Sequence, residues 1–503
     1  MTRLIKLNEN DNVAIPVEDV RRGATLADGF IALCDIPQGH KIALSDLRKG
    51  DAVIRYGVRL GFLKQEVKRG SWINEYMLDL PAPPDLDSMP CADNIKKDLP
   101  EAPRKTFEGF EIEGEQYAGT RNILGIMTTV QCVTGILNVA VEKMKRELLP
   151  KYPNVDDIVA LNHAYGCGVA INARESHIPI CSLKNLVHNP NFGGEIFMVG
   201  LGCEKLTIDK LLEPEENTAE NVIILQNYGG FQKIMDVLMK MAGVKLKKLN
   251  ERKRATLPLE KLCVGMQCGG SDAFSGVTAN PAAGYSSDLL VSAGATVLFS
   301  ELTEVRDGVH FIASRCCDAD IIQKLANEMR WYDKYLEEGG ADRSANPTPG
   351  NKKGGLVNIM EKAMGSITKS GSAPIVDVLS PGERPTKHGL IFAATPASDI
   401  VCGPEQLASG ITLQVFMTGR GTPYGLAVAP VIKVSSRTDL KNMWDDIIDV
   451  NAGTIIEGKE SIQEVGIRLF NIIVDTASGK YKPYAERYGL HNDLCIFNPA
   501  PIT

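Results

Sequence analysis

Short apolar runs separated by turn signals fill the first part of the chain. Three of these runs are Val13–Ile15, Lys41–Leu44 and Ala52–Ile54, and turn sequences such as Pro37-Gln38-Gly39 lie between them. Runs of this length, rich in β-branched residues and bounded by glycine, are typical of strands joined by tight turns. The pattern predicts a small β-rich domain over residues 1–77.

The composition changes after residue 77. Residues 78–105 contain Pro-Ala-Pro-Pro, Met-Pro, Leu-Pro and Ala-Pro, with few large apolar side chains. Because proline fixes the backbone torsion φ and lacks an amide donor, this segment is predicted to be a stiff, extended linker.

Helical and strand-like segments alternate beyond the linker. Helical patterns cover Ile136–Leu149 and Gly230–Met241. The expected strands are Ile158–Leu161, Ile196–Val199, Leu262–Met266, Thr296–Phe299, Leu390–Ala393 and Thr412–Phe416. Such alternation favours an α/β fold with mostly parallel sheets and crossover helices. We divide this region into a first α/β part, residues 106–255, and a C-terminal α/β catalytic domain, residues 256–503.

Nearly every expected strand runs directly into a glycine-rich or polar motif. Three of these motifs carry a cysteine beside glycine, namely Cys167, Cys203 and Cys268, and another carries Glu301 and Glu304. Ligands of open α/β sheets bind beyond the carboxyl ends of the strands. We therefore expect six polar motifs to converge on one crevice.

The donor types in these motifs indicate a metal site. Thiolate, imidazole and carboxylate together suit iron or zinc better than magnesium. Three thiolates could also hold an iron–sulfur cluster with one open iron, and the alternative is three packed cysteines at strand ends. The candidate ligands are His163, Cys167, Cys203, Glu204, Cys268 and Asp272. Most of the other cysteines, Cys132 among them, are expected to pack as small apolar side chains.

Two further loops offer groups that bind anions. Residues 418–425 contain Arg420 and Thr422, and residues 346–355 contain Asn351 and Lys352. Arginine can hold a carboxylate through two hydrogen bonds. The second loop lacks the Walker spacing of a nucleotide-binding loop. Each loop alone could be a plain turn, but the two together favour a small polyanionic substrate.

The N-terminal domain adds candidates of its own. Asp11 and Asn12 open an expected strand and are candidate substrate ligands, while His40 and Lys41 lie at a turn. An exposed His-Lys turn is often without function, but it can also supply a general base or a carboxylate clamp. We take His40, Lys41, Glu301 and Glu304 as candidate catalytic residues.

Charge and composition exclude several classes of protein. The 503 residues carry a net charge of -7, which argues against nucleic-acid binding. The basic stretch 245–254 is better explained as a solvated helix end. No apolar stretch reaches membrane-spanning length and no secretory signal is visible, so we expect a cytoplasmic chain without a membrane partner.

At this point the motifs resemble a known family. Matching stretches include DNVAI at 11–15, PQGHKIAL at 37–44, LPKYPNVD at 149–156, NHAYGCGVAINA at 162–173, NFGGEIFMVGLGCEK at 191–205, MQCGGSDAFSGVTANP at 266–281, DRSANPTPGNKKGG at 342–355 and FMTGRGTPYG at 416–425. On these motifs, which span nearly the whole chain, it is identified as a member of the altronate/galactarate dehydratase family. NHAYGCGVAINA and FNPAP at 497–501 look like the galactarate branch, whereas GFEIEGEQYAG at 109–119 departs from it.

The resemblance implies an N-terminal β-clip (SAF-type) domain and a lyase that removes water from galactarate, giving 5-dehydro-4-deoxy-D-glucarate. It also implies iron(II), for which a single ion is favoured over a cluster and another divalent cation could substitute in a crystal. We expect a homodimer acting on a small dicarboxylic sugar acid. The alternatives are an altronate dehydratase, a sulfolactate sulfo-lyase, a nucleotide-dependent oxidoreductase and a non-catalytic sugar-acid-binding protein. The absence of a G-x-G-x-x-G motif after the first expected strand argues against the oxidoreductase.

Overall fold

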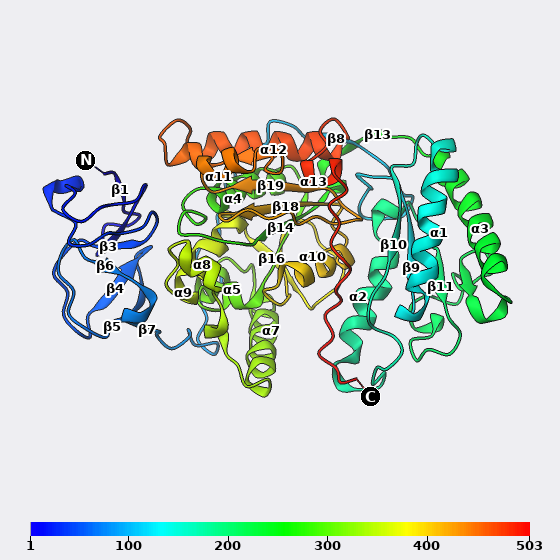
Figure 1. The fold of residues 1–503 in the computed structure, drawn as a ribbon, viewed down its shortest axis with the longest axis horizontal. Coiled ribbons are helices and arrows are strands. Elements are labelled where there is room, and N and C mark those ends of the chain that lie inside the picture. The colour runs from blue at the N-terminus through cyan, green and yellow to red at the C-terminus, as the bar shows by residue number, and fades with distance from the viewer. Residues whose placement is uncertain (1, 503) are drawn as a thin grey trace.

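The computed structural model describes residues 2–502, except for the side chain of Asp28. Three domains lie side by side along the longest axis of the molecule (Figure 1). The N-terminal domain is at one end and the second domain in sequence is at the other. The C-terminal domain lies between them, and the last residues of the chain run along its boundary with the second domain (Figure 1).

The N-terminal domain consists of two small antiparallel sheets, as the short apolar runs predict. One sheet has the order β1-β2-β3-β6 and the other the order β4-β5-β7. Their strands are β1 Leu4–Ile5, β2 Val13–Pro16, β3 Lys41–Ala43, β4 Ala52–Arg55, β5 Val58–Leu63, β6 Trp72–Ile73 and β7 Leu78–Asp79. Alternate apolar side chains of both sheets pack into one core that includes Val13, Val53 and Leu60.

The segment between β7 and β8 (Thr106–Gly109) contains no helix or strand. Three arginines of the C-terminal domain donate hydrogen bonds to its carbonyl groups: Arg343 to Pro81 at 2.6 Å, Arg306 to Pro84 at 2.8 Å and Arg330 to Leu86 at 3.3 Å. Proline-rich backbone has few amide donors but keeps its carbonyl acceptors, which suits it to this kind of contact. The linker is therefore fastened along the C-terminal domain.

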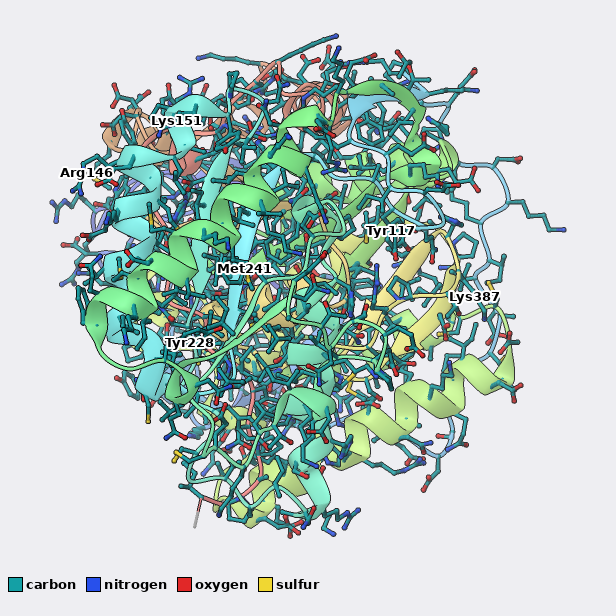
Figure 2. The ribbon with its side chains drawn as sticks, turned by 90° about the vertical axis from the view of Figure 1, so that its right-hand side faces the viewer. Tyr117, Arg146, Lys151, Tyr228, Met241 and Lys387 are labelled. Atoms are coloured by element: carbon teal, nitrogen blue, oxygen red, sulfur yellow. The ribbon has the colours of Figure 1, made fainter. Side chains whose placement is uncertain are left out.

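The second domain is built on a parallel sheet with the order β10-β9-β11-β12. Its strands are β9 Ile123–Thr128, β10 Asp157–Leu161, β11 Met198–Gly200 and β12 Val222–Ile224. The helices α1 (Thr134–Glu147) and α3 (Phe231–Glu251) cover the outer face, where Figure 2 shows them in front of the sheet with Met241 on α3. The helix α2 (His177–Val187) packs towards α10 (Asp399–Ala408) of the C-terminal domain.

The C-terminal domain has a seven-stranded parallel sheet with the order β16-β17-β15-β14-β18-β19-β20. Its strands are β14 Cys263–Cys268, β15 Thr296–Phe299, β16 Ile375–Leu379, β17 Leu390–Ala393, β18 Leu413–Thr418, β19 Val431–Ser435 and β20 Val450–Asn451. The first strand, β14, lies between β15 and β18, so the order of strands reverses there and a crevice is expected at its carboxyl end.

Helices cover both faces of this sheet, which explains why its strands are almost continuously apolar. They are α4 Ala279–Ser292, α5 Leu302–Arg306, α6 Val309–Ala313, α7 Ala319–Glu338, α8 Pro349–Lys353, α9 Ile359–Ser366, α10 Asp399–Ala408, α11 Thr438–Met443, α12 Ile462–Ala477 and α13 Tyr484–Arg487. A small antiparallel pair, β8 with β13 (Ala255–Pro258), lies where the chain enters and leaves the second domain. Among residues 2–502, no helix has the length and apolar character needed to cross a bilayer.

The six polar motifs follow strands of two different sheets, so they do not all lie at the end of a single sheet. The motifs of Cys167 and Cys203 follow strands of the four-stranded sheet, whereas the others follow strands of the seven-stranded sheet. The reason is β9, a fully buried run whose sequence Ile-Leu-Gly-Ile-Met-Thr was not recognised as a strand. It pairs with both β10 and β11 and completes a separate sheet.

A buried group of charges joins the N-terminal domain to the C-terminal domain. Glu361 of α9 accepts from Lys41 of β3 and Arg55 of β4, and all three side chains are at most 2% exposed. The Lys41 ammonium also donates to the Gly355 carbonyl. Removing one member of such a group leaves the others charged and unpaired in a medium that solvates them poorly.

We therefore predict that Glu361→Gln weakens the whole interface. The free energy of the first unfolding transition in urea should fall by about 3–5 kcal/mol, because Lys41 and Arg55 would then have no carboxylate partner. Glu66→Gln is the matched control, since its pair with Lys68 is mostly exposed and contributes less than about 1 kcal/mol. Equal losses of the free energy of unfolding in the two variants would show that the buried charges do not stabilise the interface.

Candidate functional site

A buried polar cluster lies at the carboxyl ends of β14 and β15. Cys268 is the last residue of β14, and Glu301 and Glu304 follow β15. Since β14 and β15 are neighbouring parallel strands, their carboxyl ends meet at one edge of the sheet. One ligand atom from each of the three residues lies within 4.8 Å of the other two, and all three side chains are buried.

Two lysines neutralise the two glutamates. The Lys369 Nζ lies 2.9 Å from the Glu301 carboxylate and 3.3 Å from the Cys268 Sγ. The Lys362 Nζ, on α9, lies 2.7 Å from the Glu304 carboxylate. Each buried carboxyl group thus has a lysine partner. We call these five residues the β14 cluster.

The two glutamates of the β14 cluster have opposite pKa shifts. Burial raises the pKa of Glu301, and the neighbouring charge of Glu304 adds to this effect. Burial also acts on Glu304, but the ammonium groups of Lys362 and Lys369 outweigh it and its pKa is lowered. Two carboxyl groups with pKa values pushed apart can act as an acid and a base in one reaction. Burial raises the pKa of the Cys268 thiol to about 12.

Glu301 has a backbone conformation that residues other than glycine rarely adopt. Its φ is +82°, at the position just before α5. Such a conformation costs about 1–3 kcal/mol and persists only where the surroundings fix it, often in active sites. Here the Glu301 amide donates to the Thr395 hydroxyl at 3.2 Å while the carboxylate contacts Lys369. The local fold therefore places this carboxyl group at an energetic cost.

Asp399 extends the polar region towards the second domain. It is the first residue of α10, and burial together with the charge of Glu304 raises its pKa to about 6. Its carboxylate accepts from the Gln267 side chain at 3.2 Å. Gly269 permits this approach, because a Cβ at that position would collide with the Asp399 carboxylate. Steric hindrance therefore requires glycine at the position that follows Cys268.

Asp272 and Asn351 fasten the loops next to the β14 cluster. Asp272 is buried, and its carboxylate accepts from Arg437 at 2.9 Å and from Ser436 at 3.0 Å. Asn351 is also buried and donates to the Ser271 carbonyl at 2.9 Å. These contacts bring the loop after β14 and the loop around α8 together, as a shared site requires, but they occupy both side chains.

Arg420, Thr422 and Lys352 are the more accessible members of the expected anion-binding group. Arg420 is exposed, and the other two are half-buried. A Cβ added at Gly270 would lie 3.4 Å from the Arg420 Cβ, so Arg420 lies beside the loop that follows Cys268. The structure therefore brings the 418–425 loop to the carboxyl end of β14.

His40 and Lys41 point into the interface with the C-terminal domain. The His40 Nε2 lies 3.3 Å from the Lys353 carbonyl, and burial lowers the pKa of this imidazole. Burial also lowers the pKa of Lys41 to about 8, although the charge of Glu361 opposes the effect. Both residues thus contact the segment that carries α8 and α9.

Asp11 and Asn12 make their contacts within the N-terminal domain. Asp11 accepts from the amides of Asn8 and Gly57 at 3.0 and 2.8 Å. Asn12 donates to the Ala52 carbonyl at 2.8 Å. The structure does not bring these two residues to the β14 cluster.

The other metal candidates, Cys167, Cys203, His163 and Glu204, lie in the second domain. Cys167 and Cys203 are exposed in the loops after β10 and β11. His163 is buried, and its Nε2 lies 2.7 Å from the Thr128 carbonyl. Burial lowers the pKa of His163 to about 4, so the imidazole is neutral at physiological pH. The Glu204 carboxylate accepts from the Thr129 hydroxyl and the Gly202 amide.

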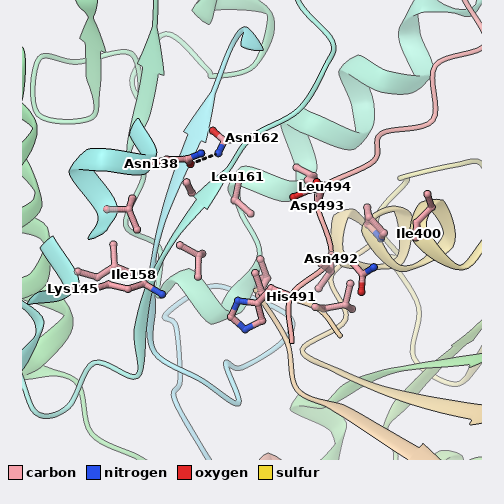
Figure 3. A pocket seen from close by; sticks show the side chains of 18 of the residues that line it. Asn138, Lys145, Ile158, Leu161, Asn162, Ile400, His491, Asn492, Asp493 and Leu494 are labelled. Carbon is pink, nitrogen blue, oxygen red and sulfur yellow. Dashed lines mark hydrogen bonds between the residues drawn. The ribbon is translucent and has the colours of Figure 1, made fainter. Parts of the chain in front are cut away.

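Two adjoining cavities separate the second domain from the C-terminal segment of the chain. Their volumes are about 380 and 720 Å³, a size that suits small organic ligands. Residues shared by both linings are Asn138, Asn162, Ile400, Asn492, Asp493 and Leu494. Figure 3 shows the smaller one, with Asn162 donating to Asn138 at 2.7 Å and with Ile400 at its opposite side. Since Ile400 follows Asp399, the cavities lie one residue from the polar region of the C-terminal domain.

Some polar residues at these sites were not predicted from the sequence. Lys362 and Lys369 lie in a helical segment whose sequence gives no sign that lysine is buried there. Cys132 was expected to pack as a small apolar residue, and the structure corrects this, because Cys132 is exposed just after β9. Recognising β9 as a strand would have identified it, since Cys132 then stands where Cys167 and Cys203 stand.

The fold and the β14 cluster define an α/β enzyme with a pair of buried carboxyl groups at the point where the strand order reverses. Three family models match successive parts of the chain. The altronate/galactarate dehydratase SAF domain matches residues 2–81, the D-galactarate dehydratase/altronate hydrolase second domain matches residues 109–250, and the D-galactarate/altronate dehydratase C-terminal model matches residues 259–502.

Curated relatives agree with these matches. The galactarate dehydratase (L-threo-forming) of Escherichia coli K12 is 53% identical, over 99% of this chain and 97% of its own length. An altronate dehydratase of Bacillus subtilis 168 is 31% identical, over 95% of this chain and 96% of its own. The (2R)-sulfolactate sulfo-lyase subunit beta of Chromohalobacter salexigens is 28% identical over 75% of this chain and 94% of its own.

This chain therefore belongs to the D-galactarate/altronate dehydratase family. The family and the SAF-type N-terminal domain that the motifs implied are confirmed, as is the α/β class of the larger part.

The opposite pKa shifts in the β14 cluster predict different costs for two isosteric variants. Glu304→Gln should lower the free energy of unfolding by about 3–5 kcal/mol, because it leaves the buried Lys362 ammonium unpaired. Glu301→Gln should cost about 1 kcal/mol at mildly acidic pH, because glutamine resembles the protonated acid that the raised pKa favours. Urea unfolding of both variants measures the difference, and a larger loss for Glu301→Gln would reverse the assignment.

Proposed function

We propose that this chain is a galactarate dehydratase that converts galactarate into 5-dehydro-4-deoxy-D-glucarate and water. The proposal draws its substrate from the relative that is 53% identical over nearly the whole chain. The structural observation that carries it is the pair Glu301 and Glu304, two adjacent carboxyl groups with opposite pKa shifts at a strand-order reversal. Removal of water from a sugar acid needs one group that accepts a proton and another that donates one.

In the proposed reaction the ionised Glu304 takes the proton from the carbon next to a substrate carboxylate. The protonated Glu301 gives its proton to the departing β-hydroxyl, which leaves as water. The resulting enol then tautomerises to the ketone. Glu304 gains one proton and Glu301 loses one, and Lys369, 2.9 Å from Glu301 and 3.9 Å from Glu304, stabilises either charge state of the pair.

We assign the distal carboxylate of the substrate to Arg420, with Thr422 and Lys352 beside it. Arg420 is exposed, whereas Glu301 and Glu304 are only 1% and 2% exposed. The substrate therefore reaches the acid–base pair only when the loops around Arg420 and Lys352 open. Lys41 and His40 take positioning roles in this proposal, because both contact the segment that carries Lys352.

Iron(II) is part of the proposal, since a cation bound to the substrate would stabilise the negative charge that develops as the proton leaves. The β14 cluster fits such an ion poorly. Its donors already hold two ammonium groups, and the high pKa of Cys268 keeps that thiol protonated. The exposed thiols of the second domain fit iron better.

The proposal also includes the cytoplasmic location and the homodimer expected from the sequence. A mass by light scattering of twice the 54.6 kDa of one chain would support the dimer.

A panel of sugar acids tests the substrate. We expect the purified iron-loaded enzyme to form a 2-keto acid from galactarate faster than from altronate, and to release no sulfite from sulfolactate. Glu301→Gln and Glu304→Gln should each lower turnover by about 10²–10⁴-fold, the usual contribution of a general acid or base. Preference for altronate would assign the chain to the other branch of its family.

The pH profile tests the assignment of roles. An acid with a raised pKa stays protonated from low pH upwards, so activity should fall as pH rises through the pKa of Glu301. The lowered pKa of Glu304 keeps it ionised until the pH falls below the ordinary 4.5 of a glutamate. Residual turnover of Glu301→Gln should lack the alkaline decline. If that decline persists, Lys41, with a pKa of about 8, is the group that titrates.

A further inference from the structure

Three exposed thiols stand at the carboxyl ends of three neighbouring strands of the second domain. Cys132 follows β9, Cys167 follows β10 and Cys203 follows β11, and β9 lies between the other two in the sheet. Since neighbouring strands are about 4.8 Å apart, their carboxyl ends place the three loops side by side. We call Cys132, Cys167 and Cys203 the thiol triad.

Direct contacts hold the three loops of the thiol triad together. The Leu206 amide, from the β11 loop, donates to the Gly166 carbonyl of the β10 loop at 3.1 Å. The Thr129 hydroxyl, from the β9 loop, donates to the Glu204 carboxylate of the β11 loop at 2.5 Å. Gly166 has a φ of +128° and lies so close to the Thr129 carbonyl that a Cβ would collide with it. Each triad loop is thus fixed to a neighbour within three residues of its cysteine.

The exposure of these thiols needs an explanation. Free cysteine is among the most buried residue types. Five of the twelve cysteines in this chain are exposed, namely Cys91, Cys132, Cys167, Cys203 and Cys317, and three of these five form the thiol triad. Packing does not account for such a concentration at one edge of one sheet, whereas binding of a metal centre does.

The thiol triad also borders a cavity of suitable size. Gln131, next to Cys132, and the segment 162–165, just before Cys167, line the cavity of about 720 Å³. The opposite wall includes Ile400, which adjoins Asp399 of the C-terminal domain. A group held by the triad would therefore lie at the rim of a space that can admit a small organic acid.

From these observations we infer that Cys132, Cys167 and Cys203 bind a [4Fe–4S] cluster whose fourth iron has no cysteine ligand. Spacing favours a cluster over a single ion. Thiolates on one tetrahedral metal lie about 3.8 Å apart, for metal–sulfur distances of about 2.3 Å. Among residues 2–502, Cys268, Glu301 and Glu304 form the one group of three such donors within 4.8 Å of one another, so at least one pair of triad sulfurs lies farther apart than that. A cluster uses a different iron for each thiolate and accommodates that separation.

This inference rests on the proposed dehydratase function for the role of the cluster, but not for its existence. An iron without a protein ligand acts as a Lewis acid towards carboxylate and hydroxyl oxygens. The protein's contribution is to hold three irons through the triad and to leave the fourth facing the cavity.

Metal analysis of the full-length chain, purified without oxygen after reconstitution with ferrous iron and sulfide, tests the site. We expect about four iron and about four acid-labile sulfide atoms per chain, with the broad visible absorption of a cluster. Cys132→Ser, Cys167→Ser and Cys203→Ser should each lose most of the sulfide and the absorption. Cys91→Ser, at an exposed cysteine outside the triad, and Cys268→Ser, at the thiol of the β14 cluster, should keep both.

Circular dichroism and gel filtration of each variant distinguish loss of the cluster from loss of the fold. One iron per chain without sulfide would overturn the cluster, as would a Cys132→Ser protein that keeps the full sulfide content. The two proposals fail separately. A chain that dehydrates galactarate without bound iron or sulfide refutes the cluster alone, and a fully loaded chain that is inert towards the acid panel refutes the proposed function alone.

Discussion

Pairing of buried charge on helix α9 is the constraint on which both the domain arrangement and the β14 cluster depend. Two consecutive residues of this helix face different partners: Glu361 holds Lys41 and Arg55 of the N-terminal domain, and Lys362 holds Glu304. Neither side chain can turn to water without leaving a buried charge behind. A shift of α9 would therefore disturb the docking of the N-terminal domain and the Glu301–Glu304 pair at the same time. This coupling gives a physical reason for a β-rich domain that supplies no side chain to the β14 cluster itself.

The separation of the chain into two parallel sheets divides its chemistry between two places. The seven-stranded sheet gathers carboxyl and ammonium groups that neutralise one another, which suits proton transfer. The four-stranded sheet gathers exposed thiols, which suit a soft metal. The N-terminal end of α10 lies between them, with Asp399 directed to the first group and Ile400 to the cavities beside the second. The first turn of α10 thus connects the two groups.

Most elements, but not their grouping into sheets, could be predicted from the sequence. Thr296–Phe299 and Leu390–Ala393 coincide with β15 and β17 because a short apolar run between polar motifs defines a buried parallel strand at both ends. β9 was not predicted because nothing in its sequence distinguishes a buried strand from a buried piece of helix. Glu301 and Glu304 were identified by their place after a strand. Lys369 could not be, since its burial depends on a carboxylate 68 residues away in sequence. Cys268 was grouped with Cys167 and Cys203 because spacing along a chain does not reveal which sheet a strand joins.

The fastened linker has a consequence for how such a protein can be encoded. Residues 80–105 join two parts that also hold each other through the buried contacts of Glu361, and the linker itself is bound through its carbonyl groups to Arg306, Arg330 and Arg343. Covalent continuity therefore adds effective concentration rather than new contacts. A gene split at this point would yield two polypeptides able to reassemble, so fusion and fission of the two reading frames are structurally close to neutral events.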